Sequence, residues 1–207
     1  MDQLTAEKLA IRETLDNWVL WRDSGDWERF KTVWHPKGWM NATWFQGPFE
    51  KFIEVSAEGF NKGLTFIHHF YGGSGCEISG DRAIAQTKMT ISQRGRVDGV
   101  LVDVLCTGRM FDFLEKYEGR WLVRRRQPIY EKDRMDPVDP TASIMLDKTL
   151  LESFPEGYRY LAYLQTRLGF PVKKGLPGLT GTSVEKLYRE GNAWLAGSEE
   201  PGDPHWP

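Results

Sequence analysis

The stretch that decides the fold is residues 78–131, ISGDRAIAQTKMTISQRGRVDGVLVDVLCTGRMFDFLEKYEGRWLVRRRQPIYE. Much of it alternates apolar with polar side chains, which is typical of strands that bury one face. Turn residues divide it at Ser79-Gly80-Asp81, at Asp98-Gly99 and at Glu118-Gly119. Together with the residues just before it, this pattern predicts an antiparallel meander of four strands, at about 65–78, 82–94, 99–114 and 120–131.

Helical patterns lie on both sides of the meander. The elements expected before it are a helix over 5–24, a short helix capped by Asp26 and ended by Pro36, a strand over 38–46, and a helix that Gly47-Pro48 opens. After it, the sequence predicts a proline-punctuated linker over 135–147 and helices over 156–168 and 183–196. Helices followed by a curled sheet predict the α+β class, with one domain over 1–134 and a helical C-terminal extension over 135–207.

The composition argues against several classes of partner. The 207 residues carry a formal net charge of −2 and a sequence pI of about 6.1, which does not favour nucleic acid or an anionic membrane. No apolar run approaches the roughly 20 residues that span a bilayer. The polar first residues lack a signal-peptide pattern, and the two cysteines form no disulfide framework. These features favour a cytoplasmic location.

Aromatic residues are abundant, with nine Trp, eleven Phe and seven Tyr. Such rings fill hydrophobic cores, and they also line pockets for flat, apolar ligands. Both roles can hold in one molecule. The sequence contains no phosphate loop, dinucleotide fingerprint or metal-ligand spacing. We therefore expect neither a metal nor an organic cofactor.

Three motifs carry a resemblance to a known family. Asp23-Ser24-Gly25-Asp26-Trp27-Glu28-Arg29 resembles the segment that joins the first two helices of scytalone dehydratase, and His69-Phe70-Tyr71-Gly72-Gly73 resembles the start of its first long strand. Gly119-Arg120-Trp121, followed by Arg126-Gln127-Pro128, resembles its last pair of strands. Over residues 5–133 the chain is therefore identified as a member of the SnoaL-like, or nuclear-transport-factor-two-like, superfamily. The resemblance implies a cone-shaped, curved antiparallel sheet wrapped by N-terminal helices, a cystatin-like α+β barrel.

The resemblance also implies a catalytic pair, Asp23 and His69. In scytalone dehydratase and hexachlorocyclohexane dehydrochlorinase, an Asp at the end of the first helix orients a strand His, which is the general base. Imidazole titrates near neutrality and can take a proton from an activated carbon, while a buried carboxylate fixes its tautomer. The competing interpretation leaves Asp23 in solvent at a helix end and makes His69 an ordinary strand residue.

Two adjacent histidines compete for the role of base. Neighbours on a strand point to opposite faces of the sheet, so only one of them enters the pocket unless a bulge intervenes. The motif match selects His69, whereas gap-free counting back from the hairpin at Asp81 selects His68. We expect His69 to be the base, with His68 as the alternative.

Other expected site residues lie where the sequence departs from scytalone dehydratase. Ser92 replaces a second pocket His, Arg22 replaces the tyrosine before the Asp, and Trp44 lies beside the position of another tyrosine. We expect these three and Arg126 to bind substrate, with Arg126 holding a phenolate, carboxylate or developing oxyanion. Tyr130 shares a strand face with Arg126 and is the expected proton donor. Alternatively, the arginines of this strand face water or pair with nearby acids.

Three further residues or pairs have expected structural roles. Asp103 and Arg109 lie on one face of a predicted strand, which favours an ion pair between them. Cys106 sits in an apolar strand and is expected in the core. His35 precedes a proline and is expected at the surface.

These patterns favour a cofactor-independent lyase that acts on an aromatic or polycyclic small molecule, either by loss of water or by C–C bond cleavage. The alternatives are an isomerase or cyclase with the same Asp–His pair, and a binding module without catalysis. A His nitrogen near Asp23 in a closed cavity would favour an enzyme. A cavity filled by aromatic side chains would favour a scaffold.

The resemblance and the C-terminal extension give two expectations about assembly. The related enzymes imply a homo-oligomer, a trimer ahead of a dimer. The helices of the extension are too short to be stable alone and must pack on another part of the protein. We expect a lid near 135–155 and a contact of the later helices with the sheet or a neighbouring subunit.

Overall fold

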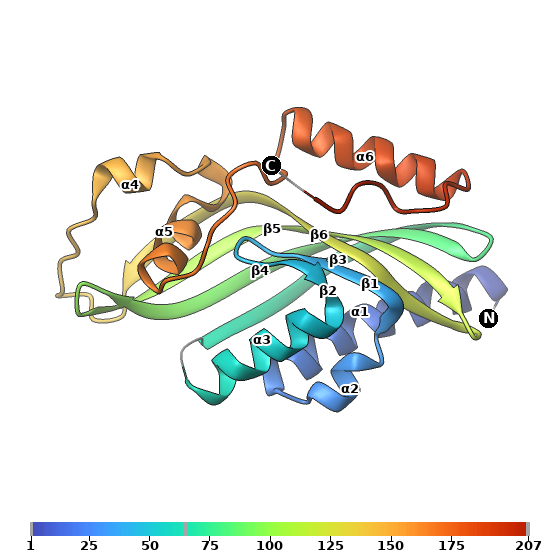
Figure 1. The fold of residues 1–207 in the computed structure, drawn as a ribbon, viewed down its shortest axis with the longest axis horizontal. Coiled ribbons are helices and arrows are strands. Elements are labelled where there is room, and N and C mark those ends of the chain that lie inside the picture. Colours follow the sequence, from blue (N-terminus) through green and yellow to red (C-terminus); the bar gives the residue numbers. More distant parts are fainter. Residues whose placement is uncertain (1, 64–65, 206–207) are drawn as a thin grey trace.

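A curved sheet forms the centre of the molecule. The computed structural model describes residues 2–63 and 66–205, in which six strands run in the order β2-β1-β6-β5-β4-β3 (Figure 1). The strands are β1 (Trp34–Asn41), β2 (Gln46–Pro48), β3 (Phe66–Ser79), β4 (Arg82–Val97), β5 (Val100–Tyr117) and β6 (Arg120–Pro137). The helices are α1 (Gln3–Ser24), α2 (Trp27–Lys31), α3 (Phe49–Asn61), α4 (Lys148–Glu152), the 3-10 turn η1 (Glu156–Tyr158), α5 (Arg159–Arg167) and α6 (Thr182–Leu195).

The predicted meander and α+β class are confirmed. Strands β3 to β6 pair antiparallel in sequence order. Asp98 and Gly99 both have positive φ, as do Glu118 and Gly119, which is the backbone of a tight two-residue hairpin. Strands β4, β5 and β6 run longer than expected, and β6 passes the expected end of the domain at 134. Residue 65, the expected start of the first strand, lies outside the described residues.

The segment around Pro36 corrects the prediction. Helix α2 ends at Lys31, and Pro36 lies inside β1, which pairs parallel with β6. The register of that pair shifts between Trp34 and Trp39. Proline cannot donate a ladder hydrogen bond, and such an irregular stretch of strand is where it is tolerated. The sequence pattern alone could not separate a short helix from an interrupted strand.

Helices cover both faces of the sheet, as Figure 1 shows. Helices α1 to α3 pack on the inner face at one end, around a core that includes Trp18, Phe30 and Trp34. The C-terminal extension forms the second core: Leu161 of α5 and Trp194 of α6 are both buried in it. Helix α6 packs on the outer face, where the Trp194 Nε1 donates to the Leu114 carbonyl at 3.2 Å. The expected contact of a later helix with the sheet is therefore present.

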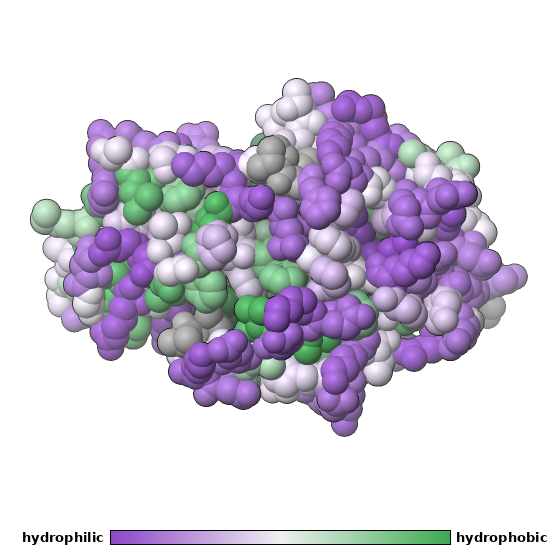
Figure 2. Space-filling model, in the orientation of Figure 1, coloured by the Kyte–Doolittle hydropathy of each residue, from purple (hydrophilic) through white to green (hydrophobic). Residues whose placement is uncertain are grey.

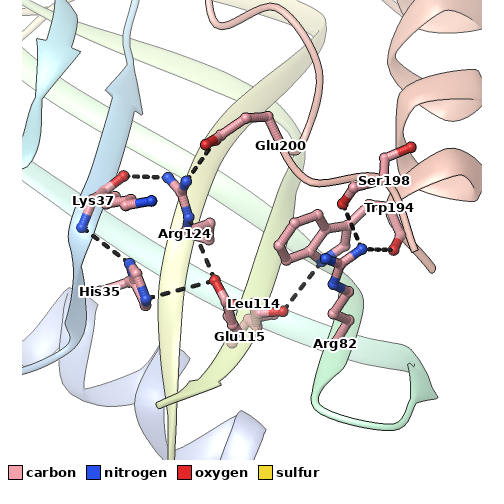
Figure 3. A network of polar contacts seen from close by, with 9 residues as sticks. All are labelled: His35, Lys37, Arg82, Leu114, Glu115, Arg124, Trp194, Ser198 and Glu200. Atoms are coloured by element: carbon pink, nitrogen blue, oxygen red, sulfur yellow. Dashed lines mark hydrogen bonds and ion pairs between the residues drawn. The ribbon is translucent and has the colours of Figure 1, made fainter. Parts of the chain in front are cut away.

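Arginines of the sheet hold the end of the chain (Figure 3). Arg82 donates to the carbonyls of Trp194 and Ser198, and Arg124 donates to Glu200 Oε2 at 2.5 Å. These bonds hold the last turn of α6 and the segment that follows it against β4 and β6.

His35 belongs to the same network and is buried, which corrects the expectation of a surface residue (Figure 3). Its Nδ1 accepts the backbone N–H of Lys37 at 3.0 Å, and its Nε2 lies 3.5 Å from Glu115. The irregular start of β1 turns the ring inward, which a helical interpretation could not anticipate.

The expected ion pair of Asp103 with Arg109 is wrong. Residues six apart on a strand are about 20 Å apart, so each finds a partner on a neighbouring strand. Arg94 makes two bonds of 2.7 Å to Asp103, and Arg109 lies 2.7 Å from Glu131. Cys106 is fully buried, as predicted.

Candidate active site

A small pocket lies on the inner face of the sheet, between α1 and α5. Its walls are mainly apolar and include Trp18, Phe52, Ile91, Met110 and Leu161. The volume that the centres of water molecules can occupy is about 30 Å³. That is enough for a water molecule and too little for an aromatic ring without movement of the walls.

Asp23 and His69 meet at this pocket. Helix α1 ends after Ser24, with Gly25 in the left-handed conformation, so Asp23 lies in its last turn and faces strand β3. His69 Nδ1 lies 2.9 Å from Asp23 Oδ1, and the His69 backbone N–H donates to Oδ2 at 2.6 Å. Both side chains are about nine-tenths buried. The competing interpretation, with Asp23 in open solvent, is wrong.

The electrostatics of the pair suit a base. Burial lowers the pKa of His69, although Asp23 acts against this shift, so the imidazole is neutral at pH 7. Burial alone would raise the pKa of Asp23, but His69 and Arg22 outweigh it and the pKa is lowered. With Nδ1–H donated to the carboxylate, Nε2 carries the free lone pair. Because His69 lines the pocket, this nitrogen is its available acceptor.

His68 does not enter the pocket. It is exposed on the opposite face of β3, and it is paired in register with Ser92 of β4. Ser92 shares that outer face, while Gln93 beside it is buried. The expectations that His68 is an alternative base and that Ser92 binds substrate are therefore not met, because strand alternation turns both residues outward.

The remaining expected site residues divide into two groups. Arg22, Trp44 and Tyr130 line the pocket, as expected. Burial raises the pKa of Tyr130 well above its usual range, so its hydroxyl keeps its proton. Arg126 lies behind Trp18 with no exposed surface and bonds to Asp112 at 2.6 and 3.0 Å. The alternative that it pairs with an acid holds, and the substrate-binding role expected of it does not.

Sequence reasoning missed a polar group that closes the pocket. Gln165 of α5 lines the cavity, accepts a bond of 2.5 Å from Thr43 Oγ1, and donates to Gln93 Oε1 at 2.9 Å. Tyr130 also hydrogen-bonds with Thr43. The available signal was a glutamine four residues after Leu161, on the apolar face of an amphipathic helix.

The lid of the pocket is α5, not the segment near 135–155. The Lys173 N–H donates to the Thr43 carbonyl at 2.9 Å, and the Phe170 ring centroid lies 5.3 Å from that of Trp44. Figure 2 shows apolar surface over the strip between α5 and α3. The C-terminal extension thus covers the pocket with residues 161–173, which follow the expected lid at 135–155.

Asp133 of β6 holds the start of α5. Its Oδ2 accepts the Leu161 N–H at 2.8 Å, as carboxylates commonly do at helix N-termini. Burial raises its pKa to about 6. The lid therefore rests on a carboxylate that titrates close to neutrality.

With this geometry established, comparison with known proteins decides the family. A family model described as a SnoaL-like domain matches residues 3–127. The chain belongs to the SnoaL-like family. A PEP2-like protein of Fusarium vanettenii is 37% identical over 208 residues, covering 96% of this chain and 89% of the relative. The pea pathogenicity protein 2 of the same species is 36% identical with the same coverage.

A solved structure gives the same fold for this SnoaL-like chain. A provisionally assigned scytalone dehydratase from Novosphingobium aromaticivorans has a TM-score of 0.53 at 15% identity, over 68% of this chain and 97% of that one. At this identity the likeness concerns the fold alone. In residues 2–63 and 66–205, no helix is long and apolar enough to cross a membrane. No group of three His, Cys, Asp or Glu side chains in the same ranges is arranged to hold a metal ion.

Proposed function

We propose that the protein is a cofactor-independent lyase in which His69 is the general base and Asp23 orients it. The observation that carries this proposal is the 2.9 Å approach of His69 Nδ1 to Asp23 Oδ1 at a small, mainly apolar pocket. Aromatic and aliphatic walls favour an aromatic or polycyclic small molecule as substrate. This pair needs no metal to take a proton at neutral pH.

The reaction class is an elimination. His69 Nε2 removes a proton from an activated carbon, and the electron pair of that C–H bond forms the new double bond. The leaving oxygen departs with its bonding pair and takes a proton from Tyr130, which the His69 cation then reprotonates. The balance is loss of one water, and Asp23 stabilises the transient imidazolium. Cleavage of a C–C bond can use the same base.

The experiment is a screen followed by a paired comparison. Aromatic compounds are tested for thermal stabilisation, since a ligand that binds only the folded state raises its melting temperature. The compounds that bind are then assayed for turnover. His69→Gln should reduce turnover by about 10²-fold or more, whereas His68→Gln, one residue away on the outer face, should leave it unchanged. Equal turnover in the two variants would refute the proposal.

Two other functions have support. An isomerase or cyclase can use the same Asp–His pair, and product analysis separates it from a lyase. A binding module without catalysis is favoured by the small cavity, whose lining includes the aromatic side chains of Trp18, Trp44 and Phe52. Ligand binding with no chemical change in either wild type or His69→Gln would establish that alternative.

We also propose a homo-oligomer, a trimer ahead of a dimer, in a reducing cytoplasmic setting. Phe66 and Phe70 are 65% and 64% exposed on the outer face of β3, an edge strand of the sheet. Exposed apolar edge strands pair with other chains unless they are covered. Both cysteines are free thiols, which fits a reducing compartment. Light scattering on wild type and Phe70→Lys tests the assembly, and a monomeric wild type contradicts it.

A further inference from the structure

Arg22 has hydrogen-bonding capacity at the pocket that its protein partners do not use. Its side chain is 8% exposed and lines the cavity. Nη1 donates to Asp23 Oδ1 at 3.2 Å and to the Ile67 carbonyl at 3.4 Å, and both bonds are long. Across the described part of the chain, no acceptor lies within hydrogen-bonding reach of Nε.

The charge of Arg22 is incompletely balanced. The Asp23 carboxylate is already held by His69 at 2.9 and 2.6 Å, and its contact with Arg22 is the longest of the three. Arg126, by comparison, makes two short bonds to Asp112, at 2.6 and 3.0 Å, although its Nη1 also has no partner among the described residues. A buried guanidinium keeps its charge and is costly unless it is paired. Arg22 therefore has donor capacity for a second anionic partner, and its side chain lines the pocket.

We propose that Arg22 binds an anionic oxygen of the ligand, so the substrate class is a small ring compound with a phenolate or an enolate oxygen. A guanidinium binds such an oxygen through a planar fork of N–H donors. When His69 takes the carbon-bound proton, the electron pair can delocalise onto that oxygen, where Arg22 holds the charge. This inference rests on the proposed use of the pocket, but it does not require His69 to be the base.

The test uses para-nitrophenol, whose absorbance reports its own ionisation, and para-nitroanisole, a similar ring compound without an ionisable group. Bound to wild type, the phenol should ionise at a lower pH than it does in water. Wild type should also bind the phenolate at least about tenfold more tightly than the anisole, as one charge-assisted hydrogen bond provides. Arg22→Met should lose both the shift and the preference.

Control variants separate this role from a purely structural one. Arg29→Met removes an arginine that is 69% exposed near the end of the same helical hairpin and should change neither readout. Arg22→Lys keeps the charge without the fork and should retain part of the preference; it carries the test if Arg22→Met does not fold. His69→Gln should keep the phenolate preference even if the lyase proposal fails. A preference that survives Arg22→Met, or a wild type that binds neither probe, overturns the inference.

Discussion

Two buried charged clusters contact the same ring, Trp18, and only one of them borders a cavity. The Arg126 guanidinium lies 4.1 Å from the ring centre and makes two hydrogen bonds to Asp112. The His69 ring lies edge-on to Trp18, with the two ring centroids 5.5 Å apart, and bonds to Asp23. The first cluster has no exposed surface, whereas the second borders a cavity.

Burial and charge therefore do not by themselves identify a functional site. Arg126 Nη1 has no hydrogen-bond partner among the described residues, but the side chain has no exposed surface through which a ligand could reach it. Arg22 Nε also has no hydrogen-bond partner among the described residues, and both Arg22 and His69 line the pocket. A site for chemistry requires this incompleteness together with access.

Arg126→Met should have the largest effect on the fold. It leaves the Asp112 carboxylate buried without its partner, and breaking such a pair costs about 3–5 kcal/mol of unfolding free energy. Urea unfolding measures the change. Replacing both residues, as Arg126→Met with Asp112→Leu, should restore much of the stability because no unpaired charge remains. A loss below about 1 kcal/mol in the single variant would contradict the structural role.

Asp23→Asn should act on chemistry more than on stability. The amide no longer fixes the His69 tautomer or stabilises its cation, so turnover of a substrate found in the screen should fall by about 10²–10⁴-fold. The unfolding free energy should change less than in Arg126→Met. Unchanged turnover, with the fold verified by circular dichroism, would show that the pair is not catalytic.

Gln165→Leu should loosen the lid. The change removes the bonds to Thr43 and Gln93 and leaves both groups buried, at a cost of about 1–3 kcal/mol. Hydrogen exchange of α5 amides should accelerate relative to wild type, while the amides of β5 keep their protection. Equal exchange rates in α5 would mean that apolar packing alone holds the lid.

Asp133→Asn should change the pH dependence of stability by a small amount. Because burial raises the folded-state pKa of Asp133 to about 6 from 3.8, its contribution to stability is full below pH 3.8 and is lost as pH rises through about 6. The amide does not titrate. Relative to wild type, the variant should therefore gain melting temperature between pH 4 and pH 8. A difference that stays constant with pH would contradict the raised pKa.

The sequence was sufficient to predict the strands of the sheet and the pairing of His69 with Asp23. Alternation and turn residues fixed the β3–β6 meander, because a hairpin needs positive φ where Asp98-Gly99 and Glu118-Gly119 stand. The motif around His69 selected the one of two adjacent histidines that lines the pocket. The pairing with Asp23 was also predictable, since a helix end and a strand start were matched to a family in which they meet.

Which polar side chains face the pocket could not be predicted from the sequence, because it depends on the tertiary structure. Because side chains alternate along a strand, Ser92 points outward and Gln93 points inward. Arg126 pairs with the buried Asp112 and does not line the pocket. The position of the lid could not be predicted from the sequence. Gln165 and Thr43 are 122 residues apart, and no local pattern encodes their contact. Side-chain direction depends on register, and long-range hydrogen bonds depend on packing, so both appear only when the chain has folded.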